Sequence, residues 1–340
     1  MRFAVIGAGA IGAYVGASLA KAGADVTLVA RGAHLRAMQE HGVRVLSERG
    51  EFHVRPAATD RCDTVGVVDC VIVALKAHQI GGMLDAMAPL FGPQTQVIAM
   101  QNGIPWWYFQ NHGGELEGLV LERVDPGGVL ARTFDPNRVI GCAVYSSTEI
   151  VEPGVIKHVE GTRYSLGHPS GEVTPAIEAI SQAFVAGGLK APVEQNLRRD
   201  VWTKLLGNVC LNPISALTRA TLVDMATDSL VEPLLREMMA ESLAIATRLG
   251  VVLEVSIDKR VDGARRVGPH KTSTLQDIEA GRALEIDCIV GAVVELGERL
   301  AIPVPATRHV YALTKLLDET TQRAVAAKLA AREVKSALHN

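Results

Sequence analysis

The N-terminal segment MRFAVIGAGAIGAYVGASLAKAGADVTLVAR (residues 1–31) decides the fold class. The apolar run over residues 3–7 predicts a buried strand, residues 10–22 have the apolar spacing of a helix, and residues 25–30 predict a second strand. Between the first strand and the helix, GAGAIG (residues 7–12) matches the pattern G-x-G-x-x-G in the strand–turn–helix setting that the motif requires. This order of elements is typical of an α/β unit that binds a dinucleotide.

Each residue of the glycine motif has an expected task. Gly7 permits the tight turn, Gly9 lets a pyrophosphate approach the backbone, and Gly12 lets the helix pack against the strand. The first helical residues, Ala10 and Ile11, lie at a helix N-terminus that faces the anion. A tight strand–helix turn without a ligand is the weaker interpretation.

The residue after the second strand bears on the choice of dinucleotide. An NAD site usually has an Asp or Glu there, which holds the ribose 2′-hydroxyl. This chain has Arg31 instead, and a guanidinium suits a 2′-phosphate. The alternative is a solvated surface arginine. We therefore expect NADP(H) as the cofactor.

Two further apolar runs, DCVIVALK (69–76) and TQVIAMQNG (95–103), predict more strands, with a helix-like segment between them. Lys76 and Asn102 stand at the ends of these runs. The carboxyl ends of parallel strands form the ligand-facing edge of such a sheet, so both residues are candidates for ligand binding. Otherwise both are loop residues without a role.

Composition excludes several classes of protein. The 340 residues suggest two domains, and the net charge of −3 disfavours a nucleic-acid or basic membrane-binding surface. No apolar run reaches the roughly 18 residues of a membrane span, and a signal peptide is disfavoured because glycines interrupt the first apolar stretch. The five scattered cysteines suggest neither disulfides nor a zinc site. We expect a cytoplasmic protein without a metal, and a homodimer is one assembly to consider.

The middle of the chain is rich in strand-like segments. Two β-rich runs flank Asp-Pro-Gly-Gly in residues 119–134, which predicts a hairpin. More strand-like pieces follow at 138–145, 155–160 and 163–167.

The last part of the chain is helical. Helical periodicity covers 197–211, 229–249, 273–300 and 306–337. The predicted fold is therefore an α/β Rossmann-type dinucleotide-binding domain (1–194) followed by an all-α C-terminal domain (195–340).

A polar stripe marks the first of these helices. Lys204, Asn208 and Asn212 follow one another at a spacing of four, which places them on one helical face. A solvated stripe usually recruits Glu, Lys and Arg, and Asn is a poor helix former. The two asparagines therefore favour carboxamide hydrogen bonding to a ligand over simple solvation.

The segment 270–291 offers Ser273, Asp277 and Glu285. Ser273 alternatively caps a helix, with Gln276 completing a capping box. Asp277 and Glu285 are alternatively surface acids, and Glu285 alternatively favours the dipole of the following helix. Spacing alone does not make these three residues catalytic.

Taken together, these motifs make the chain resemble the ketopantoate reductase (2-dehydropantoate 2-reductase) family over nearly its whole length. The resemblance rests on GAGAIG, LVAR, ALKA, QNG, WTKLLGNVCLNPISALT, TSTLQDIEAGRALEID and LAIPVP. It implies NADPH-dependent reduction of a 2-keto acid to a 2-hydroxy acid, with 2-dehydropantoate and pantoate as the expected pair, in pantothenate and coenzyme A biosynthesis.

The resemblance also implies roles for residues of the helical domain. Lys204 matches the general acid that protonates the ketone oxygen, and Asn208 and Asn212 match substrate-binding asparagines. Ser273 matches a serine that binds the substrate, and Glu285 matches a glutamate near the lysine and the ligand.

For the first domain, the resemblance implies that Asn102 lies beside the nicotinamide and the substrate. Lys76 matches a lysine on the cofactor side, and Arg31 matches the arginine of the 2′-phosphate.

Residues 104–135 depart from the compact members of the family, because aromatic residues and the predicted hairpin follow Asn102 directly. Trp106, Trp107 and Tyr108 either anchor that hairpin or line the substrate site, which leaves the identity of the keto acid open. A related 2-keto acid reductase with another substrate and a non-catalytic NADPH-binding sensor are the alternatives. A metal-assisted reducto-isomerase would need clustered acids, for which Asp277 and Glu285 are a thin basis.

Overall fold

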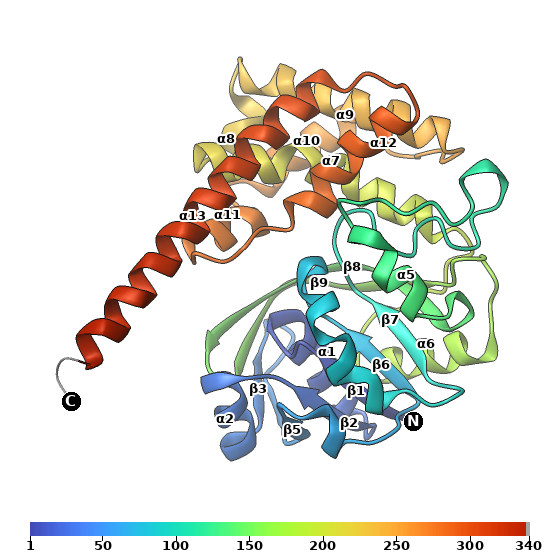
Figure 1. Ribbon diagram of the computed structural model, residues 1–340, viewed down its shortest axis with the longest axis vertical. Coiled ribbons are helices and arrows are strands. Elements are labelled where there is room, and N and C mark those ends of the chain that lie inside the picture. The colour runs from blue at the N-terminus through green and yellow to red at the C-terminus, as the bar shows by residue number, and fades with distance from the viewer. Residues whose placement is uncertain (338–340) are drawn as a thin grey trace. The chain divides into compact units, whose positions relative to one another are not determined.

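The computed structural model describes residues 1–337, and its side chains as far as Ala331. Two compact units divide the chain, Met1–Asp200 and Val201–Asn340 (Figure 1). The boundary expected from the sequence, between residues 194 and 195, lies just before helix α7 (Leu197–Thr218), whereas the contacts divide the chain inside the first turn of that helix. The predicted α/β domain followed by a helical domain is confirmed.

A nine-stranded sheet forms the first unit. Its strands are β1 (Arg2–Ile6), β2 (Asp25–Val29), β3 (Val43–Leu46), β4 (Phe52–Val54), β5 (Ala57–Thr59), β6 (Cys70–Val73), β7 (Gln96–Ala99), β8 (Val139–Glu152) and β9 (Val155–Gly167). The two strand-like pieces expected at 155–160 and 163–167 are one strand, β9, whose pairing with β8 contains register shifts.

The strand order is β4-β3-β9-β8-β7-β6-β1-β2-β5. Neighbours from β5 to β8 in this order are parallel, and β9 runs antiparallel to β8. The chain leaves β1 for β2 on one side and later returns in β6 on the other side. The direction in which successive strands are added to the sheet therefore reverses at β1. In such sheets, ligands bind at this point, beyond the carboxyl ends of the strands.

The helices of the first unit are α1 (Ala10–Lys21), α2 (Gly32–His41), α3 (Ala77–Ile80), α4 (Leu84–Met87), α5 (Val129–Thr133) and α6 (Pro175–Ala186). Helix α1 contacts β1, β2, β8 and β9 and packs beside α6. Its buried Val15 and Leu19 join Val5 and Leu28 of the strands in the core. The face of α1 predicted from its apolar spacing is thus the face that meets the sheet.

The predicted hairpin over 119–134 is wrong. Asp-Pro-Gly-Gly begins a short helix instead, with a 3₁₀ turn, Pro126–Gly128, that leads into α5. The buried Asp125 carboxylate accepts hydrogen bonds from the backbone N–H groups of Leu130 and Ala131, both at 2.9 Å. These donors belong to the first turn of the helix, where intrahelical acceptors are missing. Asp125 therefore acts as a helix cap and not as a hairpin residue.

The aromatic residues after Asn102 pack inside the first unit. Trp106, Trp107 and Tyr108 are all buried, and the Trp106 ring lies 5.1 Å from that of Phe134. This packing supports a scaffolding role for the aromatic residues, although no hairpin is there for them to anchor.

Arg198, in the first turn of α7, holds this aromatic segment. Its guanidinium donates to the carbonyl oxygens of Tyr108 (2.9 Å), Gln110 (2.9 Å) and Pro169 (2.7 Å). The cation also lies 5.5 Å from the centre of the Tyr108 ring. Burial lowers the pKa of Arg198. Three carbonyl groups from two loops are thus tied to one side chain.

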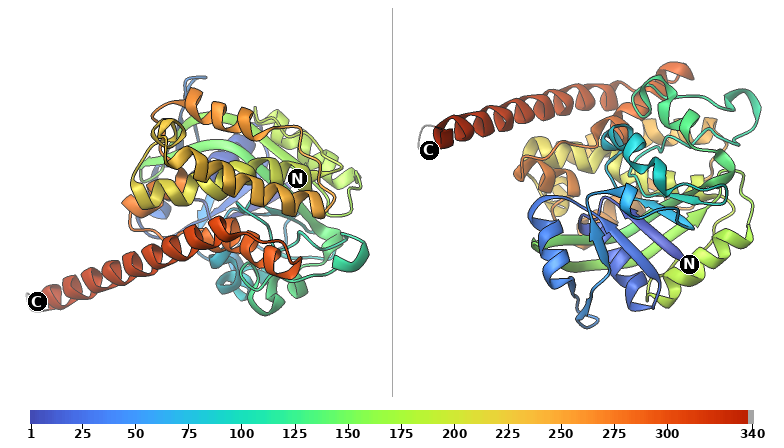
Figure 2. Two further views of the ribbon diagram at one scale, coloured as in Figure 1. Left: turned by 90° about the horizontal axis from the view of Figure 1, so that it is seen from above. Right: turned by 60° about the horizontal axis from the view of Figure 1, so that its bottom comes forward.

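The second unit is all-helical (Figures 1 and 2). Its helices after α7 are α8 (Leu222–Thr227), α9 (Val231–Arg248), α10 (Ile257–Val267), α11 (Ser273–Glu279), α12 (Ala292–Arg299) and α13 (Pro305–Ala337).

The single helix expected over 273–300 is wrong. Helix α11 ends where Gly281 adopts a φ of +66°. The N–H of Arg282 donates to the Asp277 carbonyl (2.8 Å) and that of Gly281 to the Ile278 carbonyl (3.1 Å), which is the Schellman pattern of a helix end. The chain resumes as a π-helix, Asp287–Gly291, that continues into α12.

Helix α13 is anchored at its N-terminus by a buried carboxylate. Glu241 of α9 accepts the backbone N–H groups of Ala306 and Thr307, both at 2.9 Å, and the Thr307 hydroxyl at 2.6 Å. The negative charge also suits the positive end of the helix dipole. The C-terminal half of α13 extends beyond the other helices of its unit (Figures 1 and 2).

We expect Arg198→Met to lower the free energy of unfolding by about 1–3 kcal/mol, because buried carbonyl groups would lose their donor. Urea denaturation measures the change. Arg199→Met is the matched control, since the Arg199 side chain is 40% exposed and forms a 4.0 Å ion pair with Glu194, and the substitution should cost less than about 1 kcal/mol. Equal losses in both variants would contradict the role given to Arg198.

Candidate functional site

The glycine motif forms a turn that leaves no room for side chains at two of its positions. Gly7 has a φ of +88°, and a Cβ there would lie 2.8 Å from Cδ2 of Leu75. A Cβ on Gly12 would overlap the Gly7 carbonyl oxygen. The end of β1 and the start of α1 are therefore in direct backbone contact, as the motif predicts.

The same turn has the features that a pyrophosphate needs. A Cβ on Gly9 would meet no atom closer than 4.0 Å, so the backbone there is open to approach. The first turn of α1 has no acidic residue, and the N–H groups of Ala10, Ile11 and Gly12 lie where a helix offers no acceptor of its own. These residues fit the dinucleotide that the sequence predicts.

Arg31 lies close to this turn along the backbone. The Val29 carbonyl, at the end of β2, accepts the backbone N–H groups of Gly7 (3.2 Å) and Ala8 (2.9 Å). Arg31 follows two residues later as the exposed N-cap of α2. The backbone bonds thus place the guanidinium at the same edge of the sheet as the glycine turn.

His34 was not anticipated from the sequence. It lies one helical turn beyond Arg31, and its Nδ1 accepts the Gly154 backbone N–H at 3.0 Å. Burial lowers the pKa of His34, while the Ala8 backbone raises it by less. A neutral imidazole therefore supports α2 next to the glycine turn. Its spacing of three from Arg31 was the only signal in the sequence.

Lys76 and Asn102 lie at the carboxyl ends of β6 and β7, at the same edge. The side-chain amide of Gln101 donates to the carbonyls of Val73 (2.9 Å) and Leu75 (3.1 Å), and so ties the loop after β7 to the loop after β6. Sequence reasoning missed Gln101, although it directly precedes Asn102. The first unit thus gathers all the predicted cofactor residues along one edge of parallel strands.

The polar stripe of the second unit lies on one continuous helix, α7. Lys204 and Asn208 are half-buried, and Asn212 is 5% exposed. Among the described residues, Nδ2 of Asn212 is buried and has no hydrogen-bond partner. Buried amide donors in folded proteins nearly always have acceptors, so Asn212 is suited to an acceptor that a ligand brings. Arg260 of α10 donates to the Lys204 carbonyl (3.2 Å) and supports this turn of the helix.

Ser273 and Glu285 belong to the same unit as the stripe. Thr272, not Ser273, caps α11, because its hydroxyl accepts the Leu275 N–H at 3.1 Å. The capping interpretation of Ser273 is therefore wrong, and its side chain is exposed at the first helical position. Glu285 is half-buried and lies two residues before the π-helix.

Asp277 pairs with a residue near the end of its own helix. Its carboxylate accepts a hydrogen bond from the Arg282 guanidinium at 2.8 Å, just past the end of α11. This pairing supports the helix end, so Asp277 is not a candidate for catalysis.

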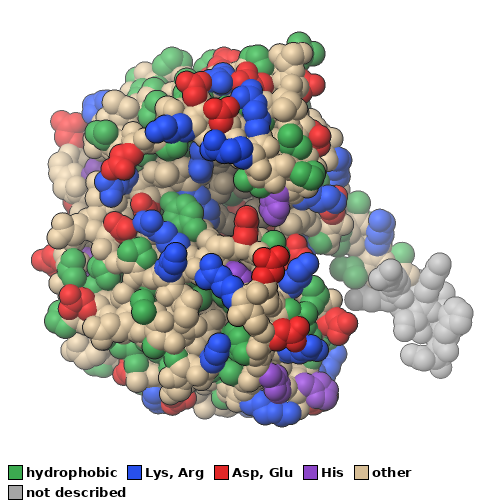
Figure 3. All heavy atoms as spheres, turned by 180° about the vertical axis from the view of Figure 1, so that it is seen from behind, with side chains coloured by type: hydrophobic (Ala, Val, Ile, Leu, Met, Phe, Trp, Pro, Cys, Tyr) green, Lys and Arg blue, Asp and Glu red, His purple; other side chains and the backbone are tan. Residues whose placement is uncertain are grey.

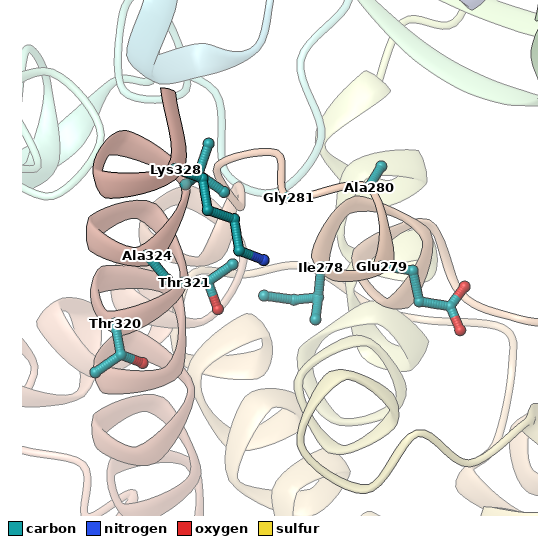
Figure 4. A pocket seen from close by; sticks show the side chains of 9 residues that line it. Ile278, Glu279, Ala280, Gly281, Thr320, Thr321, Ala324 and Lys328 are labelled. Carbon is teal, nitrogen blue, oxygen red and sulfur yellow. The ribbon is translucent and has the colours of Figure 1, made fainter. Parts of the chain in front are cut away.

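A pocket of the second unit lies between α11 and α13, with Ile278, Thr321 and Lys328 among its lining residues (Figure 4). No predicted site residue of this unit lines it. On the face drawn in Figure 3, basic and acidic side chains are interspersed.

Two features of the described residues bear on other functions. Among the side chains that the structure describes, which end at Ala331, no group of three or more His, Cys, Asp or Glu is arranged to hold a metal ion. In the same part of the chain, no helix combines the length and the apolar character needed to cross a bilayer.

Comparison with known proteins points to one family. A family model described as "Ketopantoate reductase PanE/ApbA" matches residues 3–171, and one described as "Ketopantoate reductase PanE/ApbA C terminal" matches residues 196–318. The chain is 47% identical to a 2-dehydropantoate 2-reductase of Mesorhizobium japonicum over 318 residues, which are 93% of this chain and 98% of the relative.

Solved structures agree with this. A Ralstonia solanacearum protein assigned as a ketopantoate reductase is 38% identical with a TM-score of 0.89, and the match covers 94% of this chain and 98% of that one. A D-mandelate dehydrogenase solved with NADH and anilino(oxo)acetate has a TM-score of 0.80 over 94% and 99% of the chains. At 20% identity, this second likeness shows the fold alone.

We expect Gln101→Leu to weaken dinucleotide binding by about tenfold or more, because two carbonyl groups lose their donor and the loops that carry Lys76 and Asn102 separate. Fluorescence titration with the dinucleotide measures the change. Gln96→Leu is the matched control, since Gln96 lies at the other end of β7 and its side-chain amide donates to the nearby Gln94 carbonyl. Unchanged affinity in Gln101→Leu would refute the positioning role.

Proposed function

The chain belongs to the ketopantoate reductase family of oxidoreductases that act on CH–OH groups, and we propose that it reduces 2-dehydropantoate to pantoate with NADPH. The observation that carries the reaction type is the polar stripe of α7, where one amine and two amides follow one face of a largely apolar helix. This role places the chain in pantothenate and coenzyme A biosynthesis.

The proposed cofactor is NADP(H) rather than NAD(H). The position after β2 holds Arg31, which is exposed and has no carboxylate on either side in the sequence. A guanidinium binds the 2′-phosphate of NADPH by charge-assisted hydrogen bonds, whereas an NAD site uses a carboxylate there. Lys76 adds a second positive charge at the same edge, and Asn102 is proposed to contact both cofactor and substrate.

The proposed mechanism assigns one task to each side chain. NADPH, when bound, supplies the hydride. Lys204 in its protonated form stabilises the developing alkoxide and donates a proton to the carbonyl oxygen. Asn208, Asn212 and Ser273 hold the keto acid by neutral hydrogen bonds. Glu285 orients the Lys204 amine or accepts a substrate hydroxyl.

One experiment distinguishes the proposal from its two alternatives, a 2-keto acid reductase with another substrate and a non-catalytic NADPH-binding sensor. A panel of 2-keto acids with NADPH, followed by loss of NADPH absorbance, identifies the substrate by its kcat/KM. A preferred acid other than 2-dehydropantoate would indicate a related reductase. Tight NADPH binding with no turnover of any acid would indicate a sensor instead.

The proposed setting is the cytoplasm. All five cysteines are buried and none forms a disulfide. This fits a reducing compartment, where disulfides are rare.

We expect Arg31→Ala to weaken NADPH binding by about ten- to a hundredfold, because a charge-assisted hydrogen bond to the 2′-phosphate is lost. NADH binding should change little, and isothermal titration of both cofactors checks this. Arg36→Ala, also exposed on α2, is the control and should leave both affinities unchanged. A wild-type preference for NADH would refute the cofactor assignment.

We expect Lys204→Ala to lower kcat by roughly 10²–10⁴, since general acid catalysis contributes about this much. NADPH should still bind, and circular dichroism should show a folded protein. Lys259→Ala, an exposed lysine of α10, serves as the control with wild-type rates. Activity within a few-fold of wild type in folded Lys204→Ala would remove Lys204 from the mechanism.

A further inference from the structure

Glu285 lies between two residues that are both held by helix α13. On one side, the backbone N–H of Leu284 donates to Oδ1 of Asp318 at 3.2 Å. On the other side, the carboxylate of Asp287 accepts the Tyr311 hydroxyl and the Lys315 amine, each at 2.6 Å. The three α13 residues, Tyr311, Lys315 and Asp318, are named here the α13 clamp.

The clamp is built on one face of one helix. Its residues follow at i, i+4 and i+7, the spacing of a single helical stripe. Tyr311 and Asp318 are each 8% exposed, whereas the side chains of Lys315 and Asp287 are 35% and 37% exposed. Burial raises the pKa of Asp318, with the Leu284 N–H acting against this shift. The buried Asp318 carboxyl thus binds the backbone N–H of Leu284, the residue directly before Glu285.

The held segment has an irregular backbone. Glu285 is followed by the π-helix Asp287–Gly291, and such turns often occur at functional sites because they re-aim neighbouring side chains. Asp287 is the first residue of this π-helix. Both of its oxygens bind α13, so Asp287 serves as an anchor, whereas Glu285 is the acid to which the proposed mechanism gives a task.

We propose that the α13 clamp is a positioning device for Glu285, which fixes the backbone on both sides of it and thereby sets the direction of its carboxylate. This inference rests on the proposed function. The anchor of α13 on Glu241 keeps the clamp in register, because it fixes the start of the helix one turn before Tyr311. The clamp residues act through Glu285 and are not themselves catalytic.

The test uses the full-length protein with Tyr311→Phe, Lys315→Met and the double variant. We expect kcat/KM for the keto acid to fall by about ten- to a hundredfold in the double variant, the effect of losing hydrogen bonds to a charged group. NADPH affinity should stay within twofold. In a Glu285→Gln background, the same changes should have no further effect on kcat/KM, since the clamp acts through the residue already removed.

A matched pair tests the other side of the clamp. Asp318→Asn keeps an oxygen acceptor for the Leu284 N–H and should retain activity, whereas Asp318→Leu should lose it. Arg308→Met is the control on the same helix, because it removes only the surface ion pair with Glu298 (3.0 Å). It should leave kcat/KM unchanged.

A readout that does not depend on turnover separates this inference from the proposed reaction. Amide hydrogen exchange of residues 284–291 should quicken in Tyr311→Phe/Lys315→Met, while that of α7 stays as in wild type. Unchanged exchange in that segment, or equal losses of activity with and without Glu285, would overturn the clamp. If exchange of residues 284–291 quickens in the double variant but the wild-type protein reduces no keto acid, the clamp still restrains this segment, and only the proposed function is overturned.

Discussion

The structure depends on a backbone contact at the corner between β1 and α1. The turn Gly7–Gly12 brings the helix start onto the strand end with no side chain between them, and the Val29 carbonyl joins β2 to the same point by two hydrogen bonds. Because winding reverses at β1, this corner is also where the sheet opens toward a ligand. The positions of α1, β2 and Arg31 all follow from it.

The two units carry complementary chemistry. The first presents a helix N-terminus and the cations Arg31 and Lys76 along one edge of parallel strands, an arrangement that favours phosphate groups. The second presents one amine and two amides along α7. Among the described residues, the buried Nδ2 of Asn212 has no hydrogen-bond acceptor. In the proposed function, anion binding and carbonyl chemistry belong to different parts of the chain.

Hydrogen-bonded carboxylates organise the helical unit; Glu241 and Asp318 are buried, and Asp287 is partly exposed. Glu241 caps α13, and Asp318 and Asp287 tie α13 to the segment around Glu285. A carboxylate removed from water is costly unless it is hydrogen-bonded, and each of these accepts bonds in defined directions. They therefore add directional contacts to the apolar packing of α13.

The sequence by itself determined the features that depend on near neighbours. The glycine turn, the strands beside it and the face of α7 that carries Lys204 follow from short-range spacing, because side-chain period and backbone conformation are local properties. Family membership also followed from contiguous motifs. The strands β3, β4 and β5 were missed because three or four residues are too few to show a period.

Only the tertiary structure decided what depends on distant partners. Arg198 donates to the carbonyl oxygens of Tyr108 and Gln110 across 90 and 88 residues. Asp287 meets Tyr311 and Lys315 across 24 and 28 residues, and no local pattern in the sequence encodes that meeting. A hydrogen bond between remote residues exists only once packing has set both ends, so the surroundings of Glu285 required the fold.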